Sequence, residues 1–150
     1  MPQYSQTSKD KLALCHPDLQ AILNWVIQYY DNTVADSYRT KAKQHEYFIA
    51  VPQLSKIDYP TVHNTKPSNA VDVYPYIKGQ VSYDLKQGLH FAGFVMATAK
   101  MLLEQGVITH EIRNGGDWNR DNDINDNPFE DVGHFEIVPL PGEILQYFET

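Results

Sequence analysis

The sequence is poor in cysteine, in basic residues and in long apolar runs. Its single cysteine, Cys15, cannot form an internal disulfide, and we interpret it as a small buried apolar residue rather than a nucleophile. No window approaches the roughly 20 apolar residues that a helix needs to cross a bilayer. The first residues also lack the basic segment and long apolar stretch of a secretory signal. We therefore expect neither membrane insertion nor signal-directed export.

The charge balance is acidic, with 12 Lys and Arg against 19 Asp and Glu, and the net charge is −7. Affinity for nucleic acid or for an anionic membrane surface requires clustered positive charge, so neither is expected to be the main partner. Hydrophobic residues make up 42% of the chain, which is enough for one packed core. The length fits a single domain over residues 1–150.

Hydrophobic periodicity predicts three helices. Two follow from apolar residues at helical spacing, over 17–30 and from residue 85 until Gly106, and Thr40 is suited to cap a third that reaches about Val51. Polar, breaker-rich segments at 52–69 and 114–131 are expected to be loops. The strand candidates are short: 33–39, 70–74, 107–113 and 133–138. Together these elements predict an α+β domain with a small, mostly antiparallel sheet packed with helices.

Two of the six histidines stand out because of their neighbours. His63 lies in a proline-bounded loop ahead of Asp72, which sits on a strand candidate, and His134 opens the last strand after the acidic loop. Catalytic zinc sites take three ligands from His, Asp or Glu and leave a further position to water. Two histidines and one aspartate satisfy that count, although spacing alone leaves open a metal-free role in which these residues cap loops. The other histidines are expected to be packed or solvated: His16, His45, His90 and His110.

A water held by such a metal also needs a general base. Asp131, three residues before His134, can face the same cavity across a short Val-Gly step, and Glu130 is its neighbouring rival. Glu136 points to the same side as His134 if the strand is regular. There it can orient the histidine from behind or remain a surface carboxylate.

The stretches HNTKPSNAVDVYPY, GGDW and DVGHFEIV together resemble the zinc peptidases that cut peptidoglycan stem peptides. This family includes D-Ala-D-Ala carboxypeptidases, dipeptidases and the phage L-alanyl-D-glutamate endopeptidases, and the single-domain phage endolysins are the most similar type. The similarity spans nearly the whole chain, from HPDLQ at 16–20 through SYRTKAKQ at 37–44 to HFEIV at 134–138. It implies a Hedgehog/DD-peptidase-like fold and one bound zinc ion.

The resemblance assigns the zinc ligands to His63, Asp72 and His134. The family's commoner pattern is SxH followed by an Asp seven residues on. Here Thr61 replaces the serine and the Asp comes nine residues after the His. The additional residues carry a Pro-Ser step that is similar to a phage-type variant, HNxxPSxAVD.

By the same resemblance, Asp131 is the general acid/base and Glu130 is disfavoured. Arg39 in SYRT is implied to contact the substrate or transition-state carbonyl, where its charge would face a developing oxyanion. Trp118 in GGDW is implied to lie near the cleft, with a packing role as the alternative. The loop 117–126 alternates oxygen ligands as a calcium loop does, but it lacks the Gly and Glu of an EF-hand and is otherwise a solvated loop: Asp117, Asn119, Asp121 and Asp123.

The expected function is that of a zinc-dependent endopeptidase that cuts the L-Ala–D-Glu (or L-Ala–D-Gln) bond of the bacterial peptidoglycan stem peptide during host cell lysis. The alternatives are a D-Ala-D-Ala carboxypeptidase and a non-catalytic wall-peptide-binding module, which would have no need of Asp131. We expect a monomer by default. The lack of a signal implies synthesis in the host cytoplasm, with action on the wall or periplasm after release.

Overall fold

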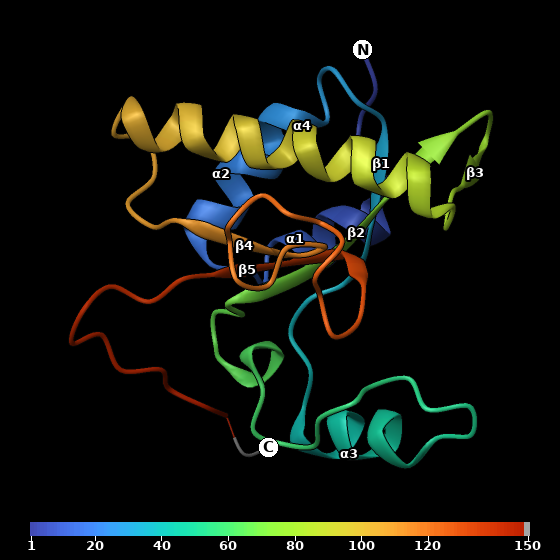
Figure 1. The fold of residues 1–150 in the computed structure, drawn as a ribbon, viewed down its shortest axis with the longest axis vertical. Helices are drawn as coiled ribbons and strands as arrows, with labels where there is room; N and C mark the ends of the chain where they lie inside the picture. Colours follow the sequence, from blue (N-terminus) through green and yellow to red (C-terminus); the bar gives the residue numbers. More distant parts are fainter. Residues whose placement is uncertain (149–150) are drawn as a thin grey trace.

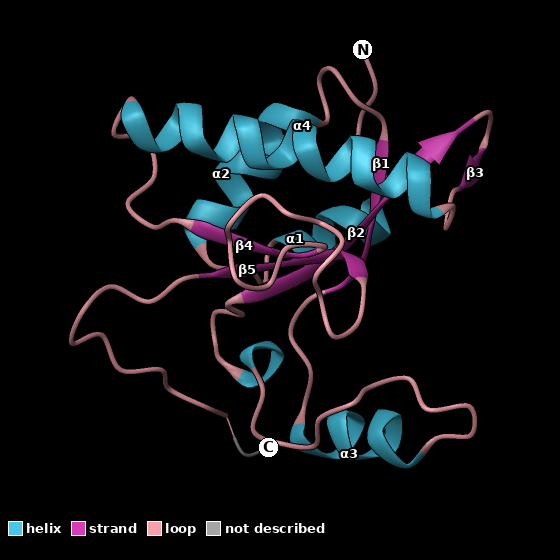
Figure 2. Cartoon of the chain, viewed as in Figure 1, coloured by secondary structure: helices cyan, strands magenta, loops and turns pink. Residues whose placement is uncertain are grey.

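The computed structural model describes residues 1–148. Figure 1 and Figure 2 show how its helices and strands are arranged. Within these residues the α-helices are α1 (Gln6–Leu12), α2 (Pro17–Val26), α3 (Lys41–Ile49) and α4 (Leu85–Glu104), and a short 3-10 helix is η1 (Val62–Asn64). The strands are β1 (Asn32–Asp36), β2 (Ala70–Ile77), β3 (Gln80–Val81), β4 (Ile112–Gly115) and β5 (Asp131–Ile137).

The strands form one antiparallel sheet in the order β1-β2-β5-β4, and β3 pairs with the far end of β2. Helices α2 and α4 pack together, and α4 also contacts β2, β4 and β5. Helix α3 and η1 lie on the opposite side of the sheet from α4 (Figure 1). The expected α+β fold with an antiparallel sheet is thus confirmed. In the described part of the chain, no helix is long and apolar enough to span a membrane.

Alternation along the two central strands separates the core from the candidate metal ligands. Val71 and Phe135 are buried in the core, and the Phe135 ring lies 6.4 Å from that of Phe91 on α4. Successive side chains of a strand point to opposite faces. The neighbouring residues Asp72 and His134 therefore face away from α4, toward the side that carries α3 and η1.

Local sequence accounts for the two best-predicted helices. Asp84 caps α4 by accepting the Gln87 amide, and Gly106 follows the helix at a φ of 73°, a left-handed conformation that glycine adopts without strain. Thr40 caps α3 by accepting the Lys43 amide at 3.1 Å. Both helices are confirmed, and α3 ends at Ile49, close to the expected end.

Five other predicted elements need correction of their bounds. The helix that was expected over 17–30 ends at Val26, because the following amides form tighter bonds to carbonyls three residues back, such as Tyr29 to Val26. The segment 70–74 extends to Ile77, through Pro75. Proline is tolerated there because β5 pairs with β2 only up to Asp72, so the missing N–H removes no bond to β5.

The strand expected over 107–113 was mostly wrong, since β4 begins at Ile112. The backbone amides of Thr109 and His110 donate to the Asp18 carboxylate of α2 instead of to a strand partner. Helix α1 was not predicted at all, although Ser5 caps it by accepting the Ser8 amide at 3.2 Å. The strand expected over 33–39 is shorter in the structure, and that over 133–138 begins two residues earlier.

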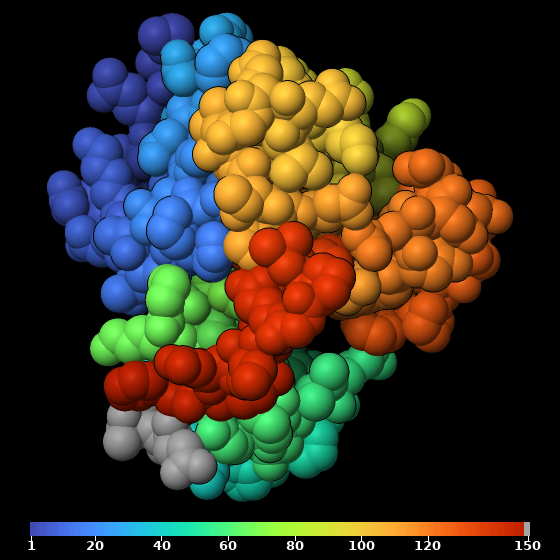
Figure 3. Space-filling model, turned by 90° about the vertical axis from the view of Figure 1, so that its left-hand side faces the viewer, coloured from blue at the N-terminus to red at the C-terminus, as the bar shows by residue number. Residues whose placement is uncertain are grey.

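After β5 the chain crosses back over the molecule. Its last described residues lie against the segment that contains η1, where Phe148 donates its amide to the Asn64 carbonyl at 2.7 Å and Tyr147 forms a bridge with Thr65. Figure 3 shows this segment in red across the green segment of the chain. The C-terminal residues therefore pack beside the short helix that carries His63.

Candidate metal centre

Three elements bring the predicted ligands together. Asp72 on β2 and His134 on β5 are direct partners in the antiparallel register. His63 lies in η1, where Thr61 caps the turn and Asn64 completes a reciprocal capping box. The predicted set is therefore assembled from residues that are far apart in sequence.

The ligand atoms converge on one point. His63 Nε2 lies 3.3 Å from His134 Nδ1 and 3.5 Å from an Asp72 carboxylate oxygen, and His134 Nδ1 lies 3.2 Å from the other Asp72 oxygen. Ligands that sit at about 2.0–2.2 Å from a zinc ion in a tetrahedral site are separated by similar distances. Two nitrogens and a carboxylate are also the donor types that zinc prefers.

The outward nitrogens of both histidines are already engaged. His63 Nδ1 lies 2.7 Å from the Ser37 carbonyl, which can only accept, so this nitrogen carries the proton and Nε2 keeps its lone pair. His134 Nε2 lies 2.9 Å from Glu136, which leaves Nδ1 directed at the centre. Partners of this kind fix the tautomer and orientation of metal-binding imidazoles. The residues present therefore fit a divalent metal ion.

Glu136 is buried, with 8% of its surface exposed, so it is not a solvated surface carboxylate. One of its oxygens holds His134, and the other lies 3.4 Å from the Arg113 guanidinium. The sequence left open whether Glu136 orients His134 or is a surface carboxylate, and the geometry favours the orientation of His134.

Electrostatics at the centre favour charged forms. Burial alone would raise the pKa of Asp72, but His63 and His134 outweigh it and hold that pKa far below its usual range. Burial alone would lower the pKa of His134, but hydrogen bonds to the Asp72 and Glu136 carboxylates raise it to about 10. The Asp72 and Glu136 carboxylates therefore favour positive charge at His134, whether as a proton or as a bound cation in its place.

Arg39 is anchored rather than extended into solvent. Its guanidinium donates to Asp36 at 2.6 Å, to Gln44 at 2.8 Å and to Asp72 at 3.1 Å, and the residue is 9% exposed. Its charge lies directly beside a predicted ligand. The arginine thus holds the Asp72 oxygen that also faces His63, while His134 faces the other oxygen.

Asp131 begins β5 and faces the same group of charges. Burial and the nearby Asp72 carboxylate raise the pKa of Asp131, while His134 and His63 oppose the rise. Glu130 is exposed on the preceding loop. Opposite Asp131, a Cβ at Gly115 would overlap the Asp131 carbonyl, so the first glycine of GGDW allows β4 to approach it closely.

Trp118 forms a wall next to the centre. Its indole nitrogen donates to the Phe129 carbonyl at 3.0 Å, and its ring lies 5.5 Å from that of His134 and 5.1 Å from that of Phe129. The resemblance implied a place near the cleft, and the structure puts the ring beside one of the predicted ligands. The hydrogen bond also ties the two ends of the long β4–β5 loop together.

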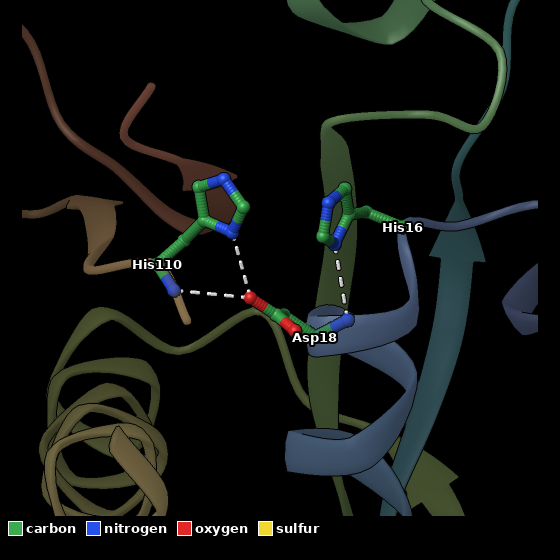
Figure 4. A group of neighbouring side chains, drawn as sticks. All are labelled: His16, Asp18 and His110. Carbon is green, nitrogen blue, oxygen red and sulfur yellow. Dashed lines mark hydrogen bonds and ion pairs between the residues drawn. The ribbon is translucent and has the colours of Figure 1, made fainter. Parts of the chain in front are cut away.

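A second histidine–aspartate group, which the sequence gave no reason to combine, contains His16, Asp18 and His110 (Figure 4). His16 Nδ1 accepts the Asp18 amide at 3.0 Å, so its lone pair caps α2. His110 places Nδ1 2.8 Å from Asp18 and Nε2 2.9 Å from Glu143. Burial alone would lower the pKa of His110, but the two carboxylates raise it above its ordinary value, and the group forms a clamp between α2 and the C-terminal segment.

The remaining expectations for polar residues have simple outcomes. Cys15 is buried, and burial raises the pKa of its thiol to about 12, as suits an inert packed cysteine. In the acidic loop, the Asp117 carboxylate accepts the Asp121 and Asn122 amides, so its oxygens close turns within the loop. Among residues 1–148, no group of possible metal ligands includes this loop.

A cavity of about 780 Å³ lies between α4, β4 and the acidic loop, with Met96, Ile112 and Ile124 in its walls. None of the three predicted ligands lines it. The predicted ligands therefore lie apart from this cavity, on the other face of the sheet.

Comparisons with known proteins bear on the family and the fold. A family model described as phage L-alanyl-D-glutamate peptidase matches residues 2–138. The crystal structure of the L-Ala D-Glu endopeptidase ChiX from Serratia marcescens is similar, with a TM-score of 0.64 and 20% sequence identity over 91% of this chain and 90% of that one. At that identity the likeness concerns the fold alone. No curated protein matches the chain.

Proposed function

The chain belongs to the phage L-alanyl-D-glutamate peptidase family and is a peptidoglycan hydrolase, and from this premise we propose that it is a zinc-dependent endopeptidase that cuts the L-Ala–D-Glu bond of the stem peptide. One observation supports the proposed zinc dependence most directly. The inward-facing atoms of His63, Asp72 and His134 converge, while the other nitrogen of each histidine is held by a partner. Such an arrangement directs one nitrogen of each histidine and a carboxylate oxygen at a common point.

In this proposal His63, Asp72 and His134 hold the zinc ion. When bound, zinc supplies a Lewis acid that polarises the scissile carbonyl and eases the ionisation of water. Asp131 accepts the proton from the attacking water and then delivers it to the leaving amine as the C–N bond breaks. The raised pKa of Asp131 suits a group that must both accept and release a proton.

Arg39 contributes positive charge on the Asp72 side of the centre. We propose that it has two effects: it fixes the Asp72 carboxylate for zinc, and its field stabilises the oxyanion that develops on the carbonyl. Because the guanidinium is bound by Asp36, Gln44 and Asp72, its position is set before substrate arrives.

Digestion of purified muropeptides, followed by mass spectrometry, tests the assignment of the bond. We expect fragments that begin at D-Glu. Loss of only the terminal D-Ala would instead identify a D-Ala-D-Ala carboxypeptidase and reject the endopeptidase assignment.

Replacement of the proposed base tests the mechanism. An Asp131→Ala variant is expected to keep its fold and bound zinc while losing nearly all activity, since the substitution removes the proton acceptor and none of the ligands. Wild-type activity in this variant would reject Asp131 as the base. We also propose that the protein acts as a monomer on the wall after release at lysis, which sedimentation of the purified protein and fractionation of lysing cells would test.

A further inference from the structure

The C-terminal segment, which the structure describes over residues 139–148, is attached to the rest of the molecule at two places. Near its start, the Glu143 carboxylate lies 2.9 Å from His110 Nε2. At its other end it lies against the segment that contains η1 (Figure 3). The family model matches residues 2–138, so the match does not include this segment. Its contacts with η1 are therefore a feature that the family assignment leaves unexplained.

The far end of the C-terminal segment is attached to the residues that directly follow His63. The Phe148 amide donates to the Asn64 carbonyl at 2.7 Å. Tyr147 forms an antiparallel bridge with Thr65. The C-terminal segment thus fixes the backbone on one side of a proposed zinc ligand.

A second segment holds the same histidine from the other side. The Ser37 carbonyl lies 2.7 Å from His63 Nδ1, and the Arg39 amide donates to the His63 carbonyl at 2.8 Å. The Asn64 side chain in turn donates to the Arg39 carbonyl at 2.9 Å. His63 is therefore held between two segments that come from distant parts of the chain.

The Phe148 ring connects these two segments. It lies 6.5 Å from the Tyr38 ring in an edge-to-face arrangement. The Lys66 ammonium lies 4.9 Å from the centre of the Phe148 ring and 5.7 Å from that of Tyr38. Tyr38 belongs to the segment that contacts the His63 imidazole, and Lys66 belongs to the segment that follows η1. Phe148 thus closes the structure around His63.

Of the three proposed ligands, His63 depends most on such contacts. Asp72 and His134 are paired on the hydrogen-bonded strands β2 and β5, whereas His63 lies in a single 3-10 turn of three residues. A turn of that length has little stability of its own, so its neighbours set its position. Zinc binds imidazole nitrogen at about 2.0–2.1 Å, and displacement of η1 therefore weakens the site.

We propose that the C-terminal segment positions the zinc centre, and that Phe148 holds His63 in place by joining the segments on either side of it. This inference rests on the proposed zinc dependence and deepens it. Phe148 acts through His63, so it is a positioning residue and not a catalytic one. Its loss lowers the affinity for zinc without removing a ligand.

Two variants separate the contributions of the ring and the backbone. Phe148→Ala removes the ring contacts and keeps the amide, whereas Phe148→Pro also removes the donor to Asn64. Phe148 is 44% exposed, so neither change removes part of the hydrophobic core. We expect the zinc dissociation constant to rise roughly three-fold in Phe148→Ala and roughly ten-fold in Phe148→Pro, at or below the lower end of the range for groups that contact a ligand directly. Competition with a chromophoric chelator measures both values, and Phe148→Tyr, which keeps the ring, should retain the wild-type affinity.

Hydrogen exchange of the metal-free protein distinguishes positioning from a general loss of stability. In Phe148→Ala and Phe148→Pro, the amides of His63 and Asn64 should exchange faster than in the wild type, while those of α4 should exchange at the wild-type rate. Cleavage of the stem peptide by Phe148→Ala should return to the wild-type rate in excess zinc, because all three ligands remain.

Tyr29→Ala is a matched control, since Tyr29 is also an exposed aromatic residue that packs against another ring, that of Trp25. It should bind zinc as the wild type does. If Phe148→Ala and Phe148→Pro retain the wild-type zinc affinity, or if exchange rises equally in α4 and η1, the positioning role is rejected while the proposed function stands. If the wild type binds no zinc, the proposed function fails, and the inference about Phe148 falls with it.

Discussion

The hydrogen bond between Glu136 and His134 gives a quantitative prediction for zinc affinity. The carboxylate lies 2.9 Å from His134 Nε2, and both residues are buried. A hydrogen bond that involves a charged group contributes about 1.5–3 kcal/mol, against about 1 kcal/mol for a neutral one. A Glu136→Gln variant keeps an acceptor and loses only the charge, whereas Glu136→Ala loses the whole interaction.

We therefore expect the zinc dissociation constant to rise roughly five- to ten-fold in Glu136→Gln and by up to about 100-fold in Glu136→Ala, within the range found for residues that support metal ligands. The 3.4 Å contact of Glu136 with Arg113 adds little, because Arg113 is partly exposed. The assay is competitive titration of zinc against a chromophoric chelator, with circular dichroism to verify the fold.

Glu111→Gln serves as the control, since Glu111 is exposed and pairs with Lys100 and Arg120. It should bind zinc as the wild type does. If Glu136→Ala also retained wild-type zinc affinity, the assignment of Glu136 as the support of His134 would be refuted, and with it the reading of His134 as a ligand through Nδ1.

Three further predictions concern the His110 clamp, the close approach of β4 to β5 at Gly115, and the hydrogen bond of Trp118. Burial lowers the pKa of His110, but its carboxylate partners raise it above the ordinary value. The clamp therefore stabilises the fold fully below about pH 6.5, and this stabilisation is lost as pH rises through the raised pKa. Thermal denaturation against pH should show this loss in the wild type and not in His110→Gln. Gly115→Ala forces a Cβ into the Asp131 carbonyl and should cost about 1–3 kcal/mol in urea unfolding; unchanged stability would contradict the close approach of β4 and β5. Trp118→Phe removes the bond to the Phe129 carbonyl and should lower stability by about 1 kcal/mol, and an unaltered urea midpoint would show that this bond does not stabilise the loop.

Local signals were sufficient for much of the fold. The cap at Thr40 and the glycine at Gly106 marked helix ends correctly, because capping depends on a few neighbouring residues. The extent of β4 was not predictable, since the amides of Thr109 and His110 are drawn to Asp18 from a distant helix. Tertiary contacts of this kind override a local run with strand-like composition.

The residues of the candidate site could be predicted, but the groups that hold them in place could not. The three proposed ligands followed from a family resemblance, whereas their residue types and spacing left a loop-capping role open. The sequence could not show that Ser37 fixes one histidine, because its carbonyl belongs to a different segment and carries no side-chain signal. The clamp of His110 with Glu143 was missed for the same reason: residues 33 positions apart meet only once the C-terminal segment crosses the sheet.

The zinc content of the purified protein tests the central claim most directly. Elemental analysis should find about one zinc per chain in the wild type and almost none in a His63→Ala variant of intact fold, because that variant loses one of three ligands. Chelator treatment should abolish wall-peptide cleavage, and added zinc should restore it. A wild-type protein that cleaves the stem peptide without bound metal, or a His63→Ala variant that retains a full zinc complement, would contradict the account.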